Sequence, residues 1–229
     1  MTAAQLVHIL QITDSFFPVG AFAYSDGLES AAASGLVRDG KGLAGWLNHY
    51  LDAVFEPCEG LALLQSMRAA RREDWTEVEA IDRELTALKP SAAVRASSRS
   101  VGKRLLATYS GRRKGAGASS VCVERASGLP EGNAAVVYGL VFADRGVEER
   151  DALLAYGYAR LTGMISAALR LISFGQQEGQ ALLSEALDRL CEKTERVVRS
   201  EAVRLRSFGP MLDIQQMNHR YVYSRLFRS

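Results

Sequence analysis

The stretch NAAVVYGLVFA, residues 133–143, decides the fold class, because it contains no charged side chain and ends just before Gly146. A helix that is apolar all round is buried on most of its sides. The segment that follows continues the helical pattern with apolar residues at positions 154, 158, 161, 165, 168 and 172. We expect these two helices to form the centre of a bundle, with Gly157 and Gly163 allowing neighbours to approach closely.

Amphipathic segments on both sides of this pair predict further helices. Asp74 and Glu77 have the spacing of a capping box, and Pro90 stops the helix that they begin. The remaining boundaries expected are a turn at residues 17–20, a second helix from about Phe22 to Ser34 with Gly35 as its stop, a third ended near Pro57 with a fourth beyond it, a long loop from Gly111 to Gly132, and a last long helix from about Gln176 to Arg206.

No strand pair, internal repeat or heptad array is found in the sequence. We therefore predict an all-α fold, a single-domain multi-helix bundle with a central buried helix pair and a C-terminal tail. Residues 1–210 form the helical bundle domain in this prediction. Residues 211–229 form a partner-binding tail that becomes part of the same domain in a complex.

Charge and cysteine content narrow the class of protein. The 28 basic and 26 acidic side chains give a net charge of only +2, which argues against nucleic acid as a partner. Arg160 and Arg170 interrupt the most apolar long stretch, so we expect a core helix there and no membrane segment. Three scattered cysteines, without a C-x-x-C pair or a secretory leader before them, fit a cytoplasmic protein.

A search for reactive groups predicts no catalytic residue, no cofactor site and no metal site. The three histidines, His8, His49 and His219, do not have the spacing of a metal site on one helix. The basic glycine-containing stretch at residues 111–117 does not satisfy the phosphate-binding loop pattern. Asp26 and Glu29 could act as an acid and a base. Helix capping by Ser25 or Asp26 is the interpretation that the sequence favours.

The tail from Tyr221 to Ser229 contains three aromatic side chains, two basic ones and no acidic one, and Arg220 precedes it. Tyrosine and arginine are enriched where proteins bind each other most strongly, and a terminus is free to fold upon a partner. The alternative is that Tyr223, Leu226 and Phe227 dock back on the bundle. The residues alone leave both readings open.

The sequence resembles the UreF family of urease accessory proteins. The resemblance lies in FPVGAFAYSDGLE at residues 17–29 and YSRLFRS at residues 223–229, with SRSVGKRLL at 98–106, AVVYG at 135–139, SAALRL at 166–171 and Gly175-Gln176 in order between them. It spans nearly the whole chain. The sequence differs from the family pattern at Ala21, Asp26, Asn133 and Arg220.

The resemblance implies an all-helical cytoplasmic protein that is not an enzyme and has no cofactor of its own. Such a protein forms a homodimer and scaffolds the accessory protein UreD, also called UreH, and the GTPase UreG for GTP-dependent insertion of nickel into apo-urease. The alternatives are a chaperone that carries nickel directly and a helical enzyme that uses residues 24–29. The implied partner-binding residues are Pro18, Gly20, Tyr24, Ser25, Glu29, Tyr221, Tyr223, Ser224, Arg225, Leu226, Phe227 and Arg228.

Overall fold

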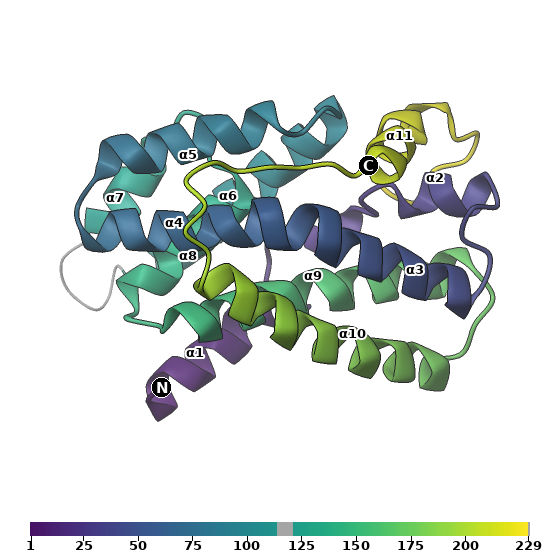
Figure 1. The fold of residues 1–229 in the computed structure, drawn as a ribbon, viewed down its shortest axis with the longest axis horizontal. Coiled ribbons are helices and arrows are strands. Elements are labelled where there is room, and N and C mark those ends of the chain that lie inside the picture. The colour runs from purple at the N-terminus through teal and green to yellow at the C-terminus, as the bar shows by residue number, and fades with distance from the viewer. Residues whose placement is uncertain (114–120, 229) are drawn as a thin grey trace.

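The computed structural model describes residues 1–113 and 121–228, and within that part of the chain every regular element is helical. The all-α prediction is confirmed. The α-helices are α1 Ala3–Thr13, α2 Leu28–Ala33, α3 Gly40–Tyr50, α4 Gly60–Arg71, α5 Trp75–Ala87, α6 Ala92–Arg113, α7 Val121–Ser127, α8 Ala134–Asp144, α9 Glu149–Leu171, α10 Gln176–Val198 and α11 Pro210–Asn218. A π-helix, Leu51–Glu59, joins α3 to α4, and 3-10 turns occupy Ala21–Ala23 and His219–Tyr221 (Figure 1).

Helix α8 lies at the centre, as the sequence predicts, because each of its residues from Ala134 to Phe142 is buried. It packs along α4 and α6, whereas α9 packs chiefly against α10. Gly139 permits the contact with α4, since a Cβ at this position would lie only 2.7 Å from the carbonyl oxygen of Leu63. Helix α4 therefore shares the centre of the bundle with the two helices that the sequence indicates.

The apolar stretch that contains Arg160 and Arg170 forms much of α9, a helix packed against other helices of the bundle. No helix in the described part of the chain is both long enough and apolar enough to cross a lipid bilayer.

The prediction that Pro57 ends the third helix is wrong. The chain stays helical from α3 through Leu51–Glu59 into α4, and Pro57 lies inside the π-helical part. A proline has no N–H and clashes with the preceding turn of an α-helix, so a local change to wider π winding accommodates it. The carbonyl oxygen of Pro57 accepts a hydrogen bond from the N–H of Arg206 at 2.9 Å.

Helix α10 is shorter than predicted, because it ends at Val198 and not near Arg206. Side chains of α4 bind the chain that follows. Arg68 Nη2 donates to the carbonyl oxygen of Val198 at 3.0 Å, and Gln65 Nε2 donates to that of Ala202 at 2.8 Å. These bonds supply partners that an irregular backbone needs, and residues 199–209 cross α4 on the way to α11 (Figure 1).

The second predicted helix also needs correction, because only Leu28–Ala33 is α-helical. Asp26 and Gly27 have φ angles of 51° and 89°, which a right-handed helix cannot contain. Gly35, with a φ angle of 72°, follows the end of α2 and is the left-handed stop that the sequence predicts.

The predicted loop from Gly111 to Gly132 is wrong at its start and within it, whereas residues 128–132 at its end are not helical, as predicted. Helix α6 continues to Arg113, and α7 spans Val121–Ser127. Val123 and Ala126 are the buried side chains of α7, so the short alternation around Cys122 belongs to a helix that turns one face inward. The centre of this segment, including Lys114, Gly115 and Gly117 of the basic stretch, lies outside the described residues.

Candidate functional site

The turn before α2 owes its shape to residues in left-handed conformations. Gly20 and Gly27 have φ angles of 70° and 89°, which glycine adopts freely. Asp26 has a φ angle of 51°, which is uncommon for any other residue. It is held there because its Oδ2 pairs with Nη1 of Arg160 at 2.9 Å. A Cβ on Gly27 would lie 2.9 Å from the backbone nitrogen of Gln216, so the close approach of α11 requires this glycine.

The N-cap residue of α2 is Gly27 and neither Ser25 nor Asp26, but the side chain of Ser25 still binds the first turn of the helix. Its hydroxyl oxygen accepts a hydrogen bond from the N–H of Glu29 at 3.4 Å, in the first turn of α2. The carboxylate of Asp26 turns instead toward Arg160.

The side chain of Glu29 joins this turn to the tail. Its Oε2 lies 2.6 Å from Nε2 of His219 and 3.3 Å from the backbone nitrogen of Phe227. Its Oε1 accepts a hydrogen bond from the N–H of Leu226 at 2.5 Å. Glu29 and His219 are both buried. The two motifs at opposite ends of the sequence therefore meet at one carboxylate.

Arg170, which lies on α9, packs against the tail. Its guanidinium carbon lies 4.4 Å from the ring centroid of Phe227, which is buried. Phe227 therefore docks on the chain's own bundle, as one of the two alternatives for the tail predicts. Tyr223 and Leu226 do not, because both are exposed. Arg170 Nη2 also donates to the carbonyl oxygen of Phe22 at 3.2 Å, which ties the turn to the same helix.

Helix α11 is fixed to α2 and the turn mainly by polar contacts. Ser30 Oγ donates to Oε1 of Gln215 at 2.7 Å, and Gln216 Nε2 donates to the carbonyl oxygen of Asp26 at 3.5 Å. Leu212 is the one apolar residue of α11 that is buried. Helix α11 and the tail consequently lie side by side with α2 at one end of the molecule (Figure 1).

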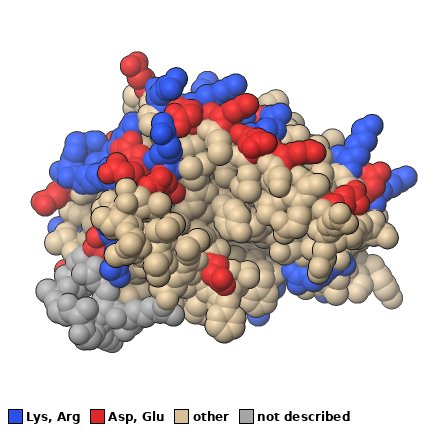
Figure 2. Space-filling view, turned by 90° about the horizontal axis from the view of Figure 1, so that it is seen from below, with Lys and Arg blue, Asp and Glu red and all other residues tan. Residues whose placement is uncertain are grey.

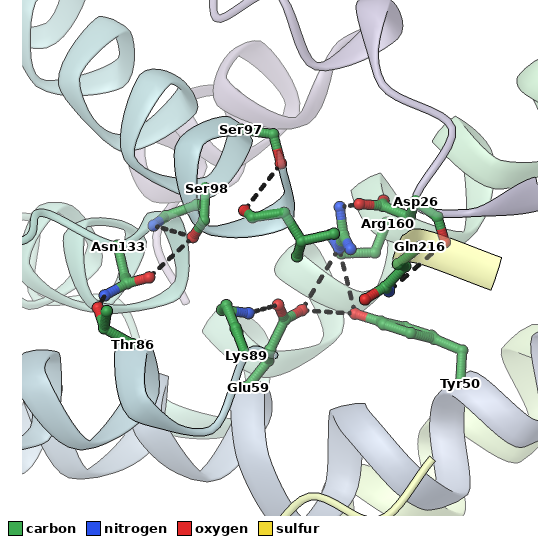
Figure 3. Close-up of polar contacts among 12 residues, drawn as sticks. Asp26, Tyr50, Glu59, Thr86, Lys89, Ser97, Ser98, Asn133, Arg160 and Gln216 are labelled. Atoms are coloured by element: carbon green, nitrogen blue, oxygen red, sulfur yellow. Dashed lines mark hydrogen bonds and ion pairs between the residues drawn. The ribbon is translucent and has the colours of Figure 1, made fainter. Parts of the chain in front are cut away.

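A cluster of buried charges lies beneath the turn (Figure 3). Glu59, at the end of the π-helix, pairs with Nζ of Lys89 at 2.6 Å and lies 3.5 Å from Nε of Arg160. The hydroxyl groups of Tyr50 and Tyr156 donate to Oε2 of Glu59 at 3.0 and 2.9 Å. Because Arg160 also pairs with the carboxylate in the turn, it connects the core of the bundle to the site.

The neighbours of Glu59 fix its charge. Burial alone would raise the pKa of Glu59, but the cations of Lys89 and Arg160 more than offset burial and lower this pKa to about 2. Burial likewise disfavours the charged form of Lys89, yet the Glu59 carboxylate raises the pKa of Lys89 above its ordinary value. Burial raises the pKa of the Cys58 thiol to about 12. The arrangement suits positioning better than proton transfer at neutral pH.

A cavity of about 70 Å³ lies beside the cluster, between the turn, α6, α8 and α9. That volume holds a few water molecules. Tyr24 and Asp26 line the cavity, but Ser25 and Glu29 do not. The enzyme alternative requires all four side chains around one pocket, so this cavity does not provide the arrangement that it needs.

Metal ligands are also not gathered in the described part of the chain, where no group of three or more His, Cys, Asp or Glu side chains is placed to hold a metal ion. His219, which the nickel-carrier alternative would use, lies against Glu29.

Asp82 and Asn133 form a second polar network, at the start of α8 (Figure 3 includes Asn133). The carboxylate of Asp82 accepts hydrogen bonds from the backbone N–H groups of Glu131, Gly132 and Asn133, at 2.8 to 2.9 Å. Asn133 does not cap α8 with its side chain. Ser98 does so instead, because its Oγ accepts from the N–H of Ala134 at 3.1 Å. The network anchors α8 to α5 and α6.

The structure separates the proposed partner-binding residues into two sets. Gly20, Ser25, Glu29 and Phe227 are buried, and Tyr24 is half-buried. The exposed ones are Pro18, Tyr221, Tyr223, Ser224, Arg225, Leu226 and Arg228. While the chain keeps this conformation, the exposed set and the accessible part of Tyr24 can touch a partner, whereas the buried residues cannot.

Comparison with known proteins identifies the family of the chain. The model of the UreF family matches residues 37–187, which is more than half of the chain. The chain belongs to the UreF family. The urease accessory protein UreF of Microcystis aeruginosa is 32% identical over 98% of this chain and 98% of its own length. UreF of Methylibium petroleiphilum is 30% identical over 99% and 95%, and UreF of Streptococcus thermophilus 28% over 97% and 94%.

The sequence indicates the turn and the tail as the candidate site of this UreF protein, but it does not indicate the buried charges that lie beneath the turn. Glu59, Lys89 and Asp82 look like ordinary surface residues of amphipathic helices. The sequence does give one signal, Arg160, because a lone arginine inside an apolar core helix must find a buried partner. Its partners become known only when the helices are placed.

Proposed function

We propose that this UreF protein is a cytoplasmic, non-catalytic scaffold of urease maturation. In this role it binds the accessory protein UreD, also called UreH, and recruits the GTPase UreG, so that GTP hydrolysis is coupled to the insertion of nickel into apo-urease. The chain works as a homodimer without a cofactor of its own, and the chemistry belongs to its partners.

The observation that carries the proposal is the display of aromatic side chains on a fixed backbone. Tyr221, Tyr223 and Leu226 are 70%, 105% and 68% exposed, although the tail is bonded to Glu29 on both sides of Tyr223. Large apolar side chains that are held in water gain free energy when a partner covers them. Because the backbone is already ordered, a partner meets little additional entropic cost at this surface.

The turn supplies a second surface for the scaffold. Pro18 is exposed, and Phe16 and Phe22 are 93% and 64% exposed on either side of it. This part of the molecule serves the dimer or UreG, while the tail serves UreD. A bridging protein has to contact more than one partner, and the turn and the tail each present exposed apolar side chains.

The test is co-purification with UreD and UreG, using the complete chain and a chain that lacks residues 221–229. We expect the deletion to abolish binding of UreD and to leave the helical circular dichroism spectrum nearly unchanged, because Phe227 is the one buried side chain among residues 221–228. A chain with Glu192→Gln, which alters one exposed side chain on α10, is the control and should bind normally.

Unchanged capture of UreD by the shortened chain would overturn the proposed role of the tail. Equilibrium dialysis of the isolated chain against Ni²⁺ tests the competing carrier function. One tightly bound Ni²⁺ per chain would show that the protein carries the metal as well as connecting its partners.

A further inference from the structure

We infer that α2, the turn before it and Arg170 form a peptide-binding site whose ligand is the chain's own C-terminal segment, residues 226–228, and that Glu29 is the residue that holds this ligand. The inference deepens the proposed function, because the bound segment sets the position of the side chains proposed to contact UreD. Glu29 would then be a positioning residue and not a contact residue.

The site binds three successive backbone N–H groups. The N–H of Leu226 donates to Oε1 of Glu29 at 2.5 Å, and that of Phe227 donates to Oε2 at 3.3 Å. The N–H of Arg228 donates to the carbonyl oxygen of Ala23 at 2.8 Å. Hydrogen bonds to an ionised carboxylate are among the stronger ones in proteins, and these are made to the main chain. The site therefore recognises an extended peptide by its backbone.

Selectivity comes from the side chain at the centre of this segment. Phe227 is buried, while its neighbours Leu226 and Arg228 are exposed. The guanidinium of Arg170 covers the ring face, which favours an aromatic residue at this position. The site thus recognises the backbone of the segment and buries one aromatic side chain, that of Phe227.

The walls of the site belong to the bundle and not to the tail. Glu29 lies in α2, whose Leu28 and Ala31 are buried in the core, and Arg170 lies in α9. The peptide-binding site can therefore keep its shape when residues 226–228 dissociate from it.

The tail is held at two points with an exposed loop between them. His219 contacts Glu29 at the first point, and residues 226–228 are bound at the second. Tyr223 lies between the two and is 105% exposed. Glu29 is itself only 3% exposed, so it cannot meet a partner directly. Its effect on UreD is transmitted through the position of the tail.

A glutamine at position 29 offers one acceptor oxygen and replaces the other with an N–H₂ group, which cannot accept a hydrogen bond. In Glu29→Gln, at least one of the two bonds to Leu226 and Phe227 is lost, and the remaining acceptor is uncharged. We therefore expect residues 226–228 to be dissociated from the site for a large fraction of the time, while the core around α2 keeps its packing.

The test measures amide hydrogen exchange of the complete chain in the absence of any partner. The expected result for Glu29→Gln is at least tenfold faster exchange at residues 226–228 than in the unchanged chain, with unchanged exchange in the core helices. Phe227→Ala leaves Glu29 in place and should release the same amides. Glu192→Gln removes an exposed carboxylate from α10 and is the matched control, for which no change is expected.

Affinity for UreD is measured with the same variants by surface plasmon resonance. We expect Glu29→Gln to weaken it about tenfold and Glu192→Gln to leave it unchanged. Unchanged exchange at residues 226–228 in both Glu29→Gln and Phe227→Ala would overturn the inferred peptide site. Faster exchange with unchanged affinity for UreD would leave the site standing and overturn the proposed role of the tail in binding UreD.

Discussion

At the scale of single residues, two buried carboxylates do different work in this protein. Glu59 faces the cations Lys89 and Arg160, and burying a charge is tolerable there because the charge is paired and hydrogen-bonded. Glu29 instead receives backbone N–H groups of the tail. The first carboxylate ties helices together in the core, and the second ties the chain terminus to them.

The pH dependence of stability tests the cluster around Glu59. The pKa of this carboxyl is about 2 in the folded chain and about 4.3 in an unfolded one. Because the folded pKa is depressed, its stabilisation is fully present above the unfolded pKa and is lost as the pH falls from about 5 to about 2. The loss amounts to about 3 kcal/mol. Urea unfolding at a series of pH values measures it.

Glu59→Gln should remove this part of the pH dependence and lower the free energy of unfolding at pH 7 by about 3 to 5 kcal/mol, because Lys89 loses its buried partner. Glu192→Gln, at an exposed position, should change the free energy by less than about 0.5 kcal/mol. If Glu59→Gln kept the full decline below pH 5, the stabilising ion pairs would have to lie elsewhere.

At the scale of elements, the sequence predicts the helices well and some of their ends badly. The start of α5 follows from Asp74, whose carboxylate accepts from the N–H of Glu77 at 3.0 Å as predicted. Burial of α8 follows from its uncharged composition. Helix ends set by distant contacts are different. The end of α10 at Val198 depends on bonds from α4, and nothing in the local sequence up to Gly209 breaks the helix.

In the candidate site, too, local features can be predicted from the sequence and contacts between distant residues cannot. The motifs around Glu29 and Phe227 can be predicted to matter, because both are unusual in composition and similar to a family pattern. That they meet cannot be predicted, since about 200 residues separate them and only the folded bundle brings them together. The pairing of Glu59 with Lys89 cannot be predicted from the sequence either, for the same reason.

Substitution of two glycines tests the close contact between α4 and α8. A Cβ at Gly139 would lie 2.7 Å from the carbonyl oxygen of Leu63, so Gly139→Ala should force the helices apart and cost about 1 to 3 kcal/mol. Gly163 lies within α9 with nothing within 4 Å of a Cβ. Gly163→Ala should therefore raise stability by up to about 1 kcal/mol. Thermal unfolding of both variants measures the difference, and equal melting temperatures would contradict the packing.

At the scale of the whole molecule, folding brings the turn and the tail to one end of the bundle and leaves α1 projecting elsewhere (Figure 1). Figure 2 shows the face seen from below, where charged side chains gather along one edge and a broad area is uncharged. Leu6, Val7 and Leu10 on α1 are exposed, and so is Phe16 after it. Exposed apolar residues in such a group indicate an interaction surface.

The exposed apolar side chains of α1 support the proposed homodimer. Helix α1 packs on its own chain through Ile9 and Ile12, so Val7→Glu with Leu10→Glu changes only side chains that face water. If a second copy covers them, two buried carboxylates without partners would prevent association. We expect the unchanged chain to sediment as a dimer and the double variant as a monomer of equal helicity. Gln11→Glu adds one charge to the same helix at another exposed position and should remain dimeric. A double variant that still sediments as a dimer would place the contact between copies away from α1, with the turn at Pro18 as the next surface to test.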